Sequence, residues 1–158
     1  MKTLTLGGGI VGLIALGKSG YLAFSMDHFK LSEFRGEHLF LSVGLLTKLD
    51  EFRERLGEPV MVSPAKGSMM RWNAPNNSQH KYGRAIDVML PKTVDFARAF
   101  KIAKEVGFTG IGFYPHWRPF PGFHVDVRPT KKVALWGAVN PEREGQRFTT
   151  IGEAFSYV

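Results

Sequence analysis

The feature that most constrains this chain is a carboxylate in the middle of an apolar run. Residues 84–90 read R-A-I-D-V-M-L, a pattern that predicts a strand with Asp87 on the face opposite its β-branched neighbours. A carboxylate in such surroundings is costly to bury unless a cation receives it. A metal ion is the natural candidate, and His80, in the polar loop before the strand, would be a neighbouring ligand. Gly83 can adopt a positive φ, which would let the chain turn back between the two.

A second strand is predicted over residues 123–128, where apolar and polar residues alternate. Its polar face carries His124 and Asp126. If this strand lies beside the first, His80, Asp87 and His124 form a set of two nitrogens and one oxygen. That is the composition of a catalytic zinc site with a fourth position open for water, and it suggests hydrolysis of an amide. The alternatives for these residues are a hydrogen-bonded, partly buried histidine and a simple surface ion pair of Asp126.

Composition limits the kinds of site that the chain can build. It has 158 residues and no cysteine, which favours a single domain and leaves only nitrogen and oxygen ligands for a metal. The net charge of +7 favours anionic partners: nucleic acid, anionic lipid or the acidic polymers of a bacterial cell wall. The basic residues are scattered and form no nucleic-acid-binding motif, so we expect no nucleic-acid partner. The alternative that the charge leaves open is a basic nucleic-acid-binding protein without a metal.

The first 26 residues differ from the rest of the chain. Residues 3–26 are apolar and glycine-rich, with Lys18 as an interruption. The uninterrupted part has the length of a signal-peptide core and is shorter than the roughly 20 residues that span a bilayer. We therefore expect residues 1–26 to be an apolar N-terminal segment, either a signal anchor that associates with a membrane or a packed tail. Residues 27–158 would form the domain.

Hydrophobic periodicity predicts two helices, over residues 39–56 and 93–106. Gly57 and Gly107 would end them, and Thr93 would cap the second. Short strands are predicted at residues 59–63, 84–90, 109–114 and 123–128. This order indicates an α+β fold, with a small antiparallel sheet that carries the zinc site and is flanked by two main helices. After Trp136 the chain is polar and its pattern assigns neither helix nor strand.

Two motifs resemble a known family. The string S-x-H-x-x-G-x-A-x-D at residues 78–87 is similar to the first signature of the D-alanyl-D-alanine carboxypeptidase-like zinc peptidases. The G-I-G-F-Y-P segment at residues 110–115, followed by F-H-V-D at residues 123–126, resembles the second signature. The combination is similar to the peptidoglycan-cleaving branch, which includes phage endolysins and bacterial murein endopeptidases. The resemblance covers roughly residues 28–136.

The resemblance implies zinc bound by His80, Asp87 and His124 in a small α+β domain. Its expected activity is hydrolysis of peptide bonds in cell-wall stem peptides, by an endopeptidase or a carboxypeptidase. The protein would work outside the cytoplasm or at the membrane of a bacterium, or in a phage virion. The rival function is a zinc-holding, non-catalytic module that binds the cell wall. Which bond would be cut is left open.

The chain departs from the family at the expected general base. Several branches place a Glu or Asp three residues before the last zinc ligand, where this chain has Pro121. The candidates for the base are Asp126, which shares a strand face with His124, and His116 on the preceding loop. The alternative for Asp126 is to orient a ligand histidine. The alternative for His116 is an exposed loop residue packed near Trp117.

The chain also lacks the family's S-G-Y-R segment, whose arginine helps to bind substrate. Residues 63–68 read S-P-A-K-G-S in its place. Lys66 and Arg71 are therefore the candidates for recognition of a substrate carboxylate, although a lysine would not reproduce the two-pronged contact of an arginine. Tyr114 is a candidate for the wall of the substrate cleft.

Overall fold

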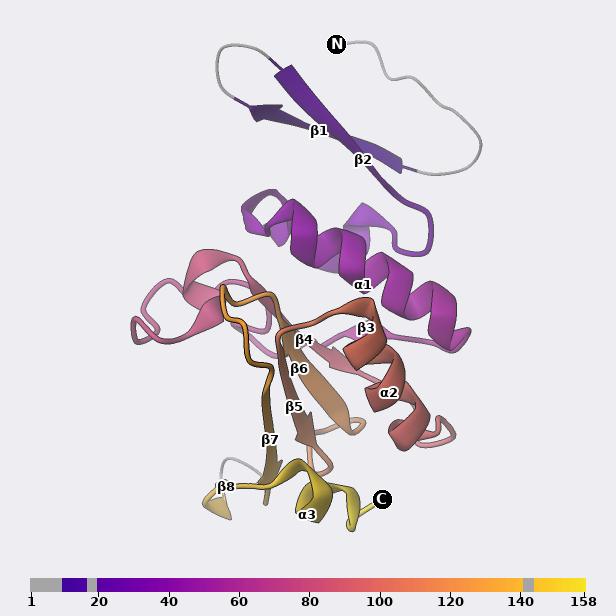
Figure 1. Cartoon of the computed structure of the whole chain (residues 1–158), viewed down its shortest axis with the longest axis vertical. Coiled ribbons are helices and arrows are strands. Elements are labelled where there is room, and N and C mark those ends of the chain that lie inside the picture. The colour runs from indigo at the N-terminus through magenta and orange to yellow at the C-terminus, as the bar shows by residue number, and fades with distance from the viewer. Residues whose placement is uncertain (1–9, 17–19, 141–143) are drawn as a thin grey trace.

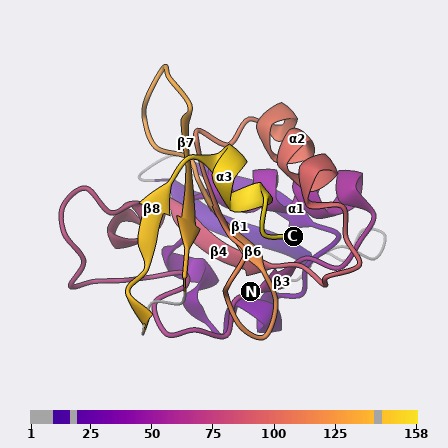
Figure 2. The same cartoon turned by 90° about the horizontal axis from the view of Figure 1, so that it is seen from below.

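A six-stranded sheet forms the centre of the computed structural model, which describes residues 10–16, 20–140 and 144–158. The strand order is β3-β4-β6-β5-β7-β8, and every neighbouring pair is antiparallel except β5 and β7 (Figure 1). Figure 2 shows β8 at the edge of the sheet and α3 beside β7. The strands are β3 (Met61–Val62), β4 (Ala85–Met89), β5 (Gly110–Tyr114), β6 (Gly122–Asp126), β7 (Ala134–Val139) and β8 (Arg147–Thr149). The predicted α+β class is confirmed.

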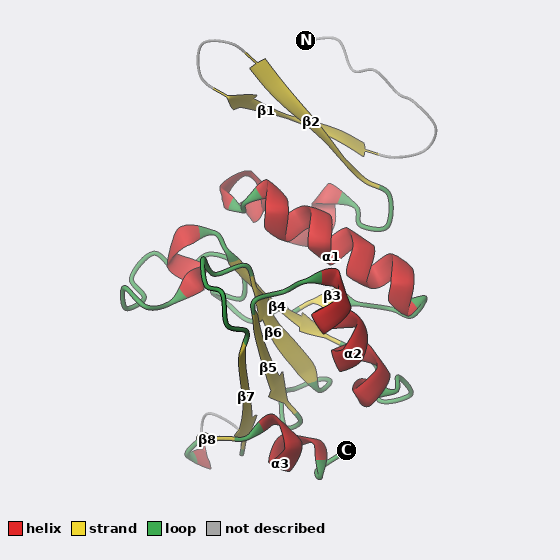
Figure 3. Ribbon diagram, viewed as in Figure 1, coloured by secondary structure: helices red, strands yellow, loops and turns green. Residues whose placement is uncertain are grey.

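Three α-helices, α1 (Val43–Leu56), α2 (Phe96–Val106) and α3 (Ile151–Phe155), accompany the sheet (Figure 3). The first predicted helix begins later than expected, because residues 37–40 form a 3-10 helix and Leu41 is extended. Ser42 then caps α1, its hydroxyl accepting the Leu45 amide at 3.3 Å, and Gly57 ends it at φ 66°. The short 3-10 helices are η2 (Leu31–Phe34), η3 (Glu37–Phe40) and η4 (Gln79–Tyr82).

The predicted cap of the second helix was wrong. Thr93 lies in a turn closed by the Val94 amide, which donates to the Pro91 carbonyl at 3.0 Å. The helix therefore begins after Asp95, whose carboxylate accepts the Arg98 amide at 3.0 Å. Gly107 ends α2, as predicted.

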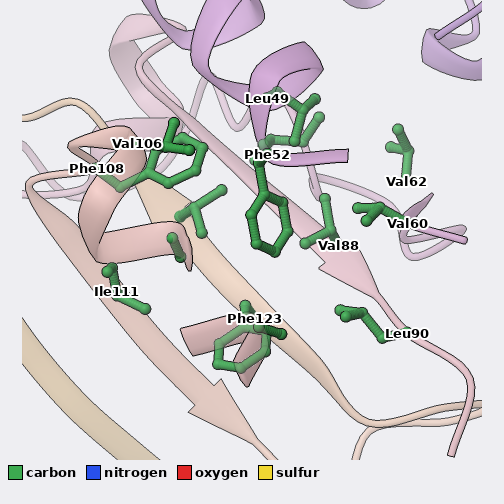
Figure 4. Close-up of a cluster of buried hydrophobic side chains, with 14 of the residues drawn as sticks. Leu49, Phe52, Val60, Val62, Val88, Leu90, Val106, Phe108, Ile111 and Phe123 are labelled. Carbon is green, nitrogen blue, oxygen red and sulfur yellow. The ribbon is translucent and has the colours of Figure 1, made fainter. Parts of the chain in front are cut away.

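The hydrophobic core lies on one face of the sheet. Alternate strand residues such as Val88, Ile111 and Phe123 point toward the helices, where Phe52 of α1 meets them (Figure 4). The C-terminal helix covers the same face, since the ring of Phe155 stacks on Phe113 at 4.6 Å. The side chains of the strand residues between these point to the opposite face of the sheet, and Asp87 and His124 of the predicted site are among them.

The N-terminal segment forms a hairpin of β1 (Ile10–Leu16) and β2 (Gly20–Met26), on the far side of α1 from the sheet (Figure 1). Asp50 of α1 holds the chain as it enters the domain, accepting the amides of residues 27–29 at 2.9–3.2 Å. Within the described residues no helix is long and apolar enough to cross a membrane. The expected signal anchor or packed tail stays a prediction, and residues 1–9 and 17–19 lie outside the described residues.

Candidate metal centre

Three predicted ligands meet on the open face of the sheet. Asp87 of β4 and His124 of β6 are direct cross-strand partners, and His80 arrives from η4. The carboxylate oxygen Oδ1 of Asp87 lies 3.0 Å from His124 Nδ1 and 3.3 Å from His80 Nε2. The two imidazole nitrogens are 3.1 Å apart, and one ligand atom of each residue lies within 4.8 Å of the others. All three side chains are buried.

Gly83 brings His80 back to the strand. It ends η4 with φ 63°, and its carbonyl accepts the Ser42 amide at 2.8 Å. A Cβ at this position would lie only 1.9 Å from the Phe40 carbonyl oxygen. Glycine is therefore required here for both its conformation and its lack of a side chain. The G of the first motif is explained by this close approach of η3 and η4.

The outer nitrogen of each imidazole already has an acceptor. His80 Nδ1 lies 3.0 Å from the Met69 carbonyl oxygen, and His124 Nε2 lies 3.1 Å from Asp126 Oδ2. If these nitrogens carry the ring protons, the inner ones, His80 Nε2 and His124 Nδ1, present lone pairs to each other and to the Asp87 carboxylate. Three such donors at this spacing repel one another unless a cation lies between them. The set of two imidazoles and one carboxylate fits zinc, and acceptors behind the ligand histidines are typical of metal sites.

Asp126 lies behind His124, on the side of the ring away from the cluster. Its carboxylate is fully buried and accepts the backbone amide of Arg128 at 3.0 Å and the guanidinium Nε at 2.9 Å. Of the two roles expected from the sequence, this geometry favours orientation of His124 over proton transfer in the cleft.

The charges of the cluster shift its pKa values. Without a bound metal the inner imidazole nitrogens can carry protons. Burial then opposes ionisation of Asp87, but hydrogen bonds from His124 and His80 outweigh it and lower the pKa of Asp87 to about 2. Burial likewise opposes ionisation of Asp126, and hydrogen bonds from His124 and Arg128 bring its pKa well below the usual range. Burial lowers the pKa of His124, but its hydrogen bonds to Asp126 and Asp87 outweigh this and raise it.

Two glycines of β5 leave room for larger side chains of the neighbouring strands. A Cβ at Gly110 would lie 2.1 Å from the Asp126 carboxylate, and one at Gly112 would lie 2.3 Å from the Trp136 indole. Gly112 pairs with His124 on one side and with Trp136 on the other. The G-I-G motif therefore creates the space in which Asp126 and Trp136 lie against the sheet.

A cleft of about 770 Å³ opens over the cluster. The predicted substrate-binding residues Lys66, Arg71 and Tyr114 all line it, and the Arg71 guanidinium lies 3.7 Å from Asp87 Oδ2. Their role in substrate binding stays a prediction. Among the described residues that line the cleft, Asp87 is the one acidic side chain.

His116, the second candidate base, lies elsewhere. Its Nδ1 accepts the Asn140 amide at 2.9 Å, and its ring packs edge-on against Tyr157. Among the described residues that line the cleft His116 is absent. The structure therefore does not bring it to the cluster.

The sequence did not single out several residues that line the cleft, among them Trp136, Phe148, Arg118 and Gln146. Trp136 packs 5.2 Å from His124, centroid to centroid, and donates its indole N–H to the Tyr114 hydroxyl at 3.1 Å. The available signal for Trp136 was the glycine pair of β5, since missing side chains on one strand leave space for large ones on its neighbours. No comparable signal pointed to Phe148.

Comparison with known proteins adds one finding. Neither the curated proteins nor the solved structures give a match. The family model described as Peptidase M15 matches residues 23–126, about two thirds of the chain, and this stretch contains all three candidate ligands. The resemblance seen in the two motifs is thereby confirmed: the chain belongs to the peptidase M15 family, the D-Ala-D-Ala carboxypeptidase-like group of zinc peptidases.

Proposed function

We propose that this protein is a zinc peptidase that hydrolyses peptide bonds in the stem peptides of bacterial peptidoglycan. His80 Nε2, a carboxylate oxygen of Asp87 and His124 Nδ1 would hold the metal. The observation that carries the proposal is their convergence in a buried cluster whose outer imidazole nitrogens are both engaged by acceptors. Membership of the peptidase M15 family supports it.

When bound, zinc would supply Lewis acidity, polarising a peptide carbonyl and lowering the pKa of water. The protein's own residues prepare the site for this. The Met69 carbonyl and Asp126 fix the orientation of the two imidazoles, and Arg128 fixes Asp126 in turn. Rigid ligands present the same geometry at every turnover, which is the requirement for catalysis by preorganisation.

Cations on the cleft wall would receive the carboxylates of a stem peptide. The cleft is lined by the cationic side chains of Lys66, Arg71, Arg118 and Arg128. Among the described residues that line it, the one acid is Asp87, which belongs to the metal cluster itself. The net charge of +7 would further favour approach to an anionic wall. With this substrate, we propose that the protein works outside the cytoplasm, at the bacterial envelope or as part of a phage virion.

Digestion of purified sacculi tests the proposal. Wild-type protein with zinc should release fragments with new amino termini from stem peptides, identified by mass spectrometry, and His80→Ala should release none. His116→Ala is the matched control, because its imidazole lies against Asn140 and Tyr157, away from the cluster. Equal release by wild type and His80→Ala would refute the proposal.

A second candidate function is a zinc-holding module that binds the cell wall without cutting it. Two observations favour it: Pro121 stands where other branches have an acid, and Asp126 lies behind His124 and is absent from the described residues that line the cleft. Metal analysis and a sacculus-sedimentation assay separate the two functions. Stoichiometric zinc and sedimentation with sacculi, without fragment release, would select the binding module.

A further inference from the structure

The β7–β8 hairpin adds an aromatic wall to the cleft. It lies outside residues 23–126, the part that matches the family. Phe148 of β8 pairs with Ala138 of β7, two residues beyond Trp136, so Phe148 and Trp136 stand on the same face of the sheet. Both side chains line the cleft that contains the metal cluster.

Phe148 leaves a large apolar side chain exposed to solvent in the cleft. The residue is 66% exposed although it lines a cleft. It lies on β8, an edge strand of three residues. A single exposed phenylalanine is ordinary on a protein surface, but this one lines the same cleft as Trp136, Tyr114 and Trp117. Tyr114 and Trp117 stack at 4.1 Å, and Trp136 is hydrogen-bonded to Tyr114. The Arg128 guanidinium lies over the Trp136 ring at 5.3 Å, so among the described aromatic residues of the cleft Phe148 is the exposed one.

Trp136 packs against the candidate ligand His124, and Phe148 lies at the end of the wall that is farther from the metal cluster. β8 is three strand positions from β6, the strand that carries His124. At about 4.8 Å per strand, Phe148 lies about 14 Å from the ligand strand, measured across the sheet. An extended peptide advances about 3.4 Å per residue, so about four residues bridge this distance. A group that binds at Phe148 is therefore joined to the scissile bond by a short peptide.

We propose that Phe148 and Trp136 form a subsite for a sugar ring of the glycan strand to which the stem peptide is attached. This inference rests on the proposed function and names the part of its substrate that binds beyond the peptide. A pyranose ring presents an apolar C–H face, which packs on flat aromatic rings, and a rim of hydroxyl and amide groups. Gln146 and Arg128 line the same cleft and can bond to that rim.

An apolar amino-acid side chain fits this wall less well. Apolar ligand groups bind in concave pockets that remove most of their surface from water. Phe148 is mostly exposed, and the same cleft is lined by the polar side chains of Gln146 and Arg128. A ligand with one apolar face and a polar rim satisfies both kinds of side chain.

The direct test is binding of peptide-free glycan, the N-acetylated disaccharide repeat, to the full chain. This ligand has no peptide bond, so its binding is measured whether or not the protein is active. Wild type should bind it in calorimetric titration, Phe148→Ala should bind about tenfold more weakly, and Phe148→Tyr should bind as wild type does. Phe40→Ala is the matched control, since Phe40 is also an exposed phenylalanine and lies outside the cleft.

A cleavage assay gives the second readout. For a stem peptide attached to the disaccharide, kcat/KM should fall about tenfold in Phe148→Ala, while kcat/KM for the same free peptide stays within about twofold of wild type. Absence of glycan binding by wild type, or equal binding by Phe148→Ala and Phe40→Ala, overturns the sugar subsite. If wild type cleaves neither substrate, the proposed function is overturned. The glycan-binding result would still decide whether Phe148 and Trp136 form a sugar subsite.

Discussion

Replacing Asp126 with asparagine tests how the metal ligands are oriented. The carboxylate accepts from the His124 ring, the Arg128 amide and the Arg128 guanidinium. An asparagine of the same shape keeps one acceptor oxygen and points an NH₂ donor at one of these donors. His124 then loses its fixed tautomer or Arg128 loses its partner. Loss of such an outer acceptor weakens metal binding by about 10–100-fold, or about 1.4–2.8 kcal/mol.

The charges around His124 also determine the direction in which the pH dependence of zinc affinity should shift in the variant. Asp126 and Asp87 raise the pKa of His124, and a protonated imidazole cannot bind metal. Zinc affinity should therefore decline as the pH falls through this raised pKa. In Asp126→Asn one of the two stabilising charges is gone, so the pKa of His124 is lower. The decline should begin at a lower pH than in wild type, although binding at neutral pH is weaker.

Competition with a chromophoric chelator across a pH series measures both effects. Asp95→Asn is the control, because Asp95 caps α2 and is absent from the described residues that line the cleft, and because asparagine caps equally well. It should leave affinity and midpoint unchanged. Wild-type affinity and an unmoved midpoint in Asp126→Asn would refute the assignment of Asp126 as the residue that orients His124.

Three further predictions concern stability. Gly112→Ala forces a methyl group into the Trp136 indole and should lower the free energy of unfolding by about 1–3 kcal/mol, measured by urea denaturation. Gly44→Ala, in α1 with no atom within 4 Å of the new methyl group, should raise it by about 0.5–1 kcal/mol, and destabilisation there would contradict the packing argument. Asp50→Ala strands the three amides of residues 27–29 and should cost about 1–3 kcal/mol, with faster proteolysis at that junction. Unchanged cleavage at the junction would show that Asp50 does not hold the entry to the domain.

The metal cluster could be predicted because strands alternate with a period of two. The apolar residues of β4 and β6 identify the buried face, and the polar residues between them must share the other. His124 was therefore placed beside Asp87 correctly once the two strands were taken as neighbours. The direction of Asp126 could not be read in this way. Sharing a face with His124 leaves open whether the carboxylate points into the cleft or behind the ring, and the Arg128 side chain decides it.

The C-terminal wall of the cleft could not be predicted for a different reason. β7 pairs with β5 in parallel, so its register depends on a crossover and not on a local turn. β8 has only three residues and α3 only five, too few to establish a period. The cap of α2 was also decided by structure outside the local pattern. Thr93 and Asp95 are both good caps, and the turn at Pro91 determines which of them precedes the helix.

The alternation of β6 also limits how this protein can change by insertion or deletion. One extra residue between Gly122 and His124 would carry the imidazole into the hydrocarbon interior and push Val125 out toward the solvent. Such an indel would abolish folding and metal binding in a single step, whereas the hairpin that bears Phe148 can lengthen or shorten without shifting this frame. Diversification of substrate preference among related chains is therefore expected to accumulate in the β7–β8 hairpin.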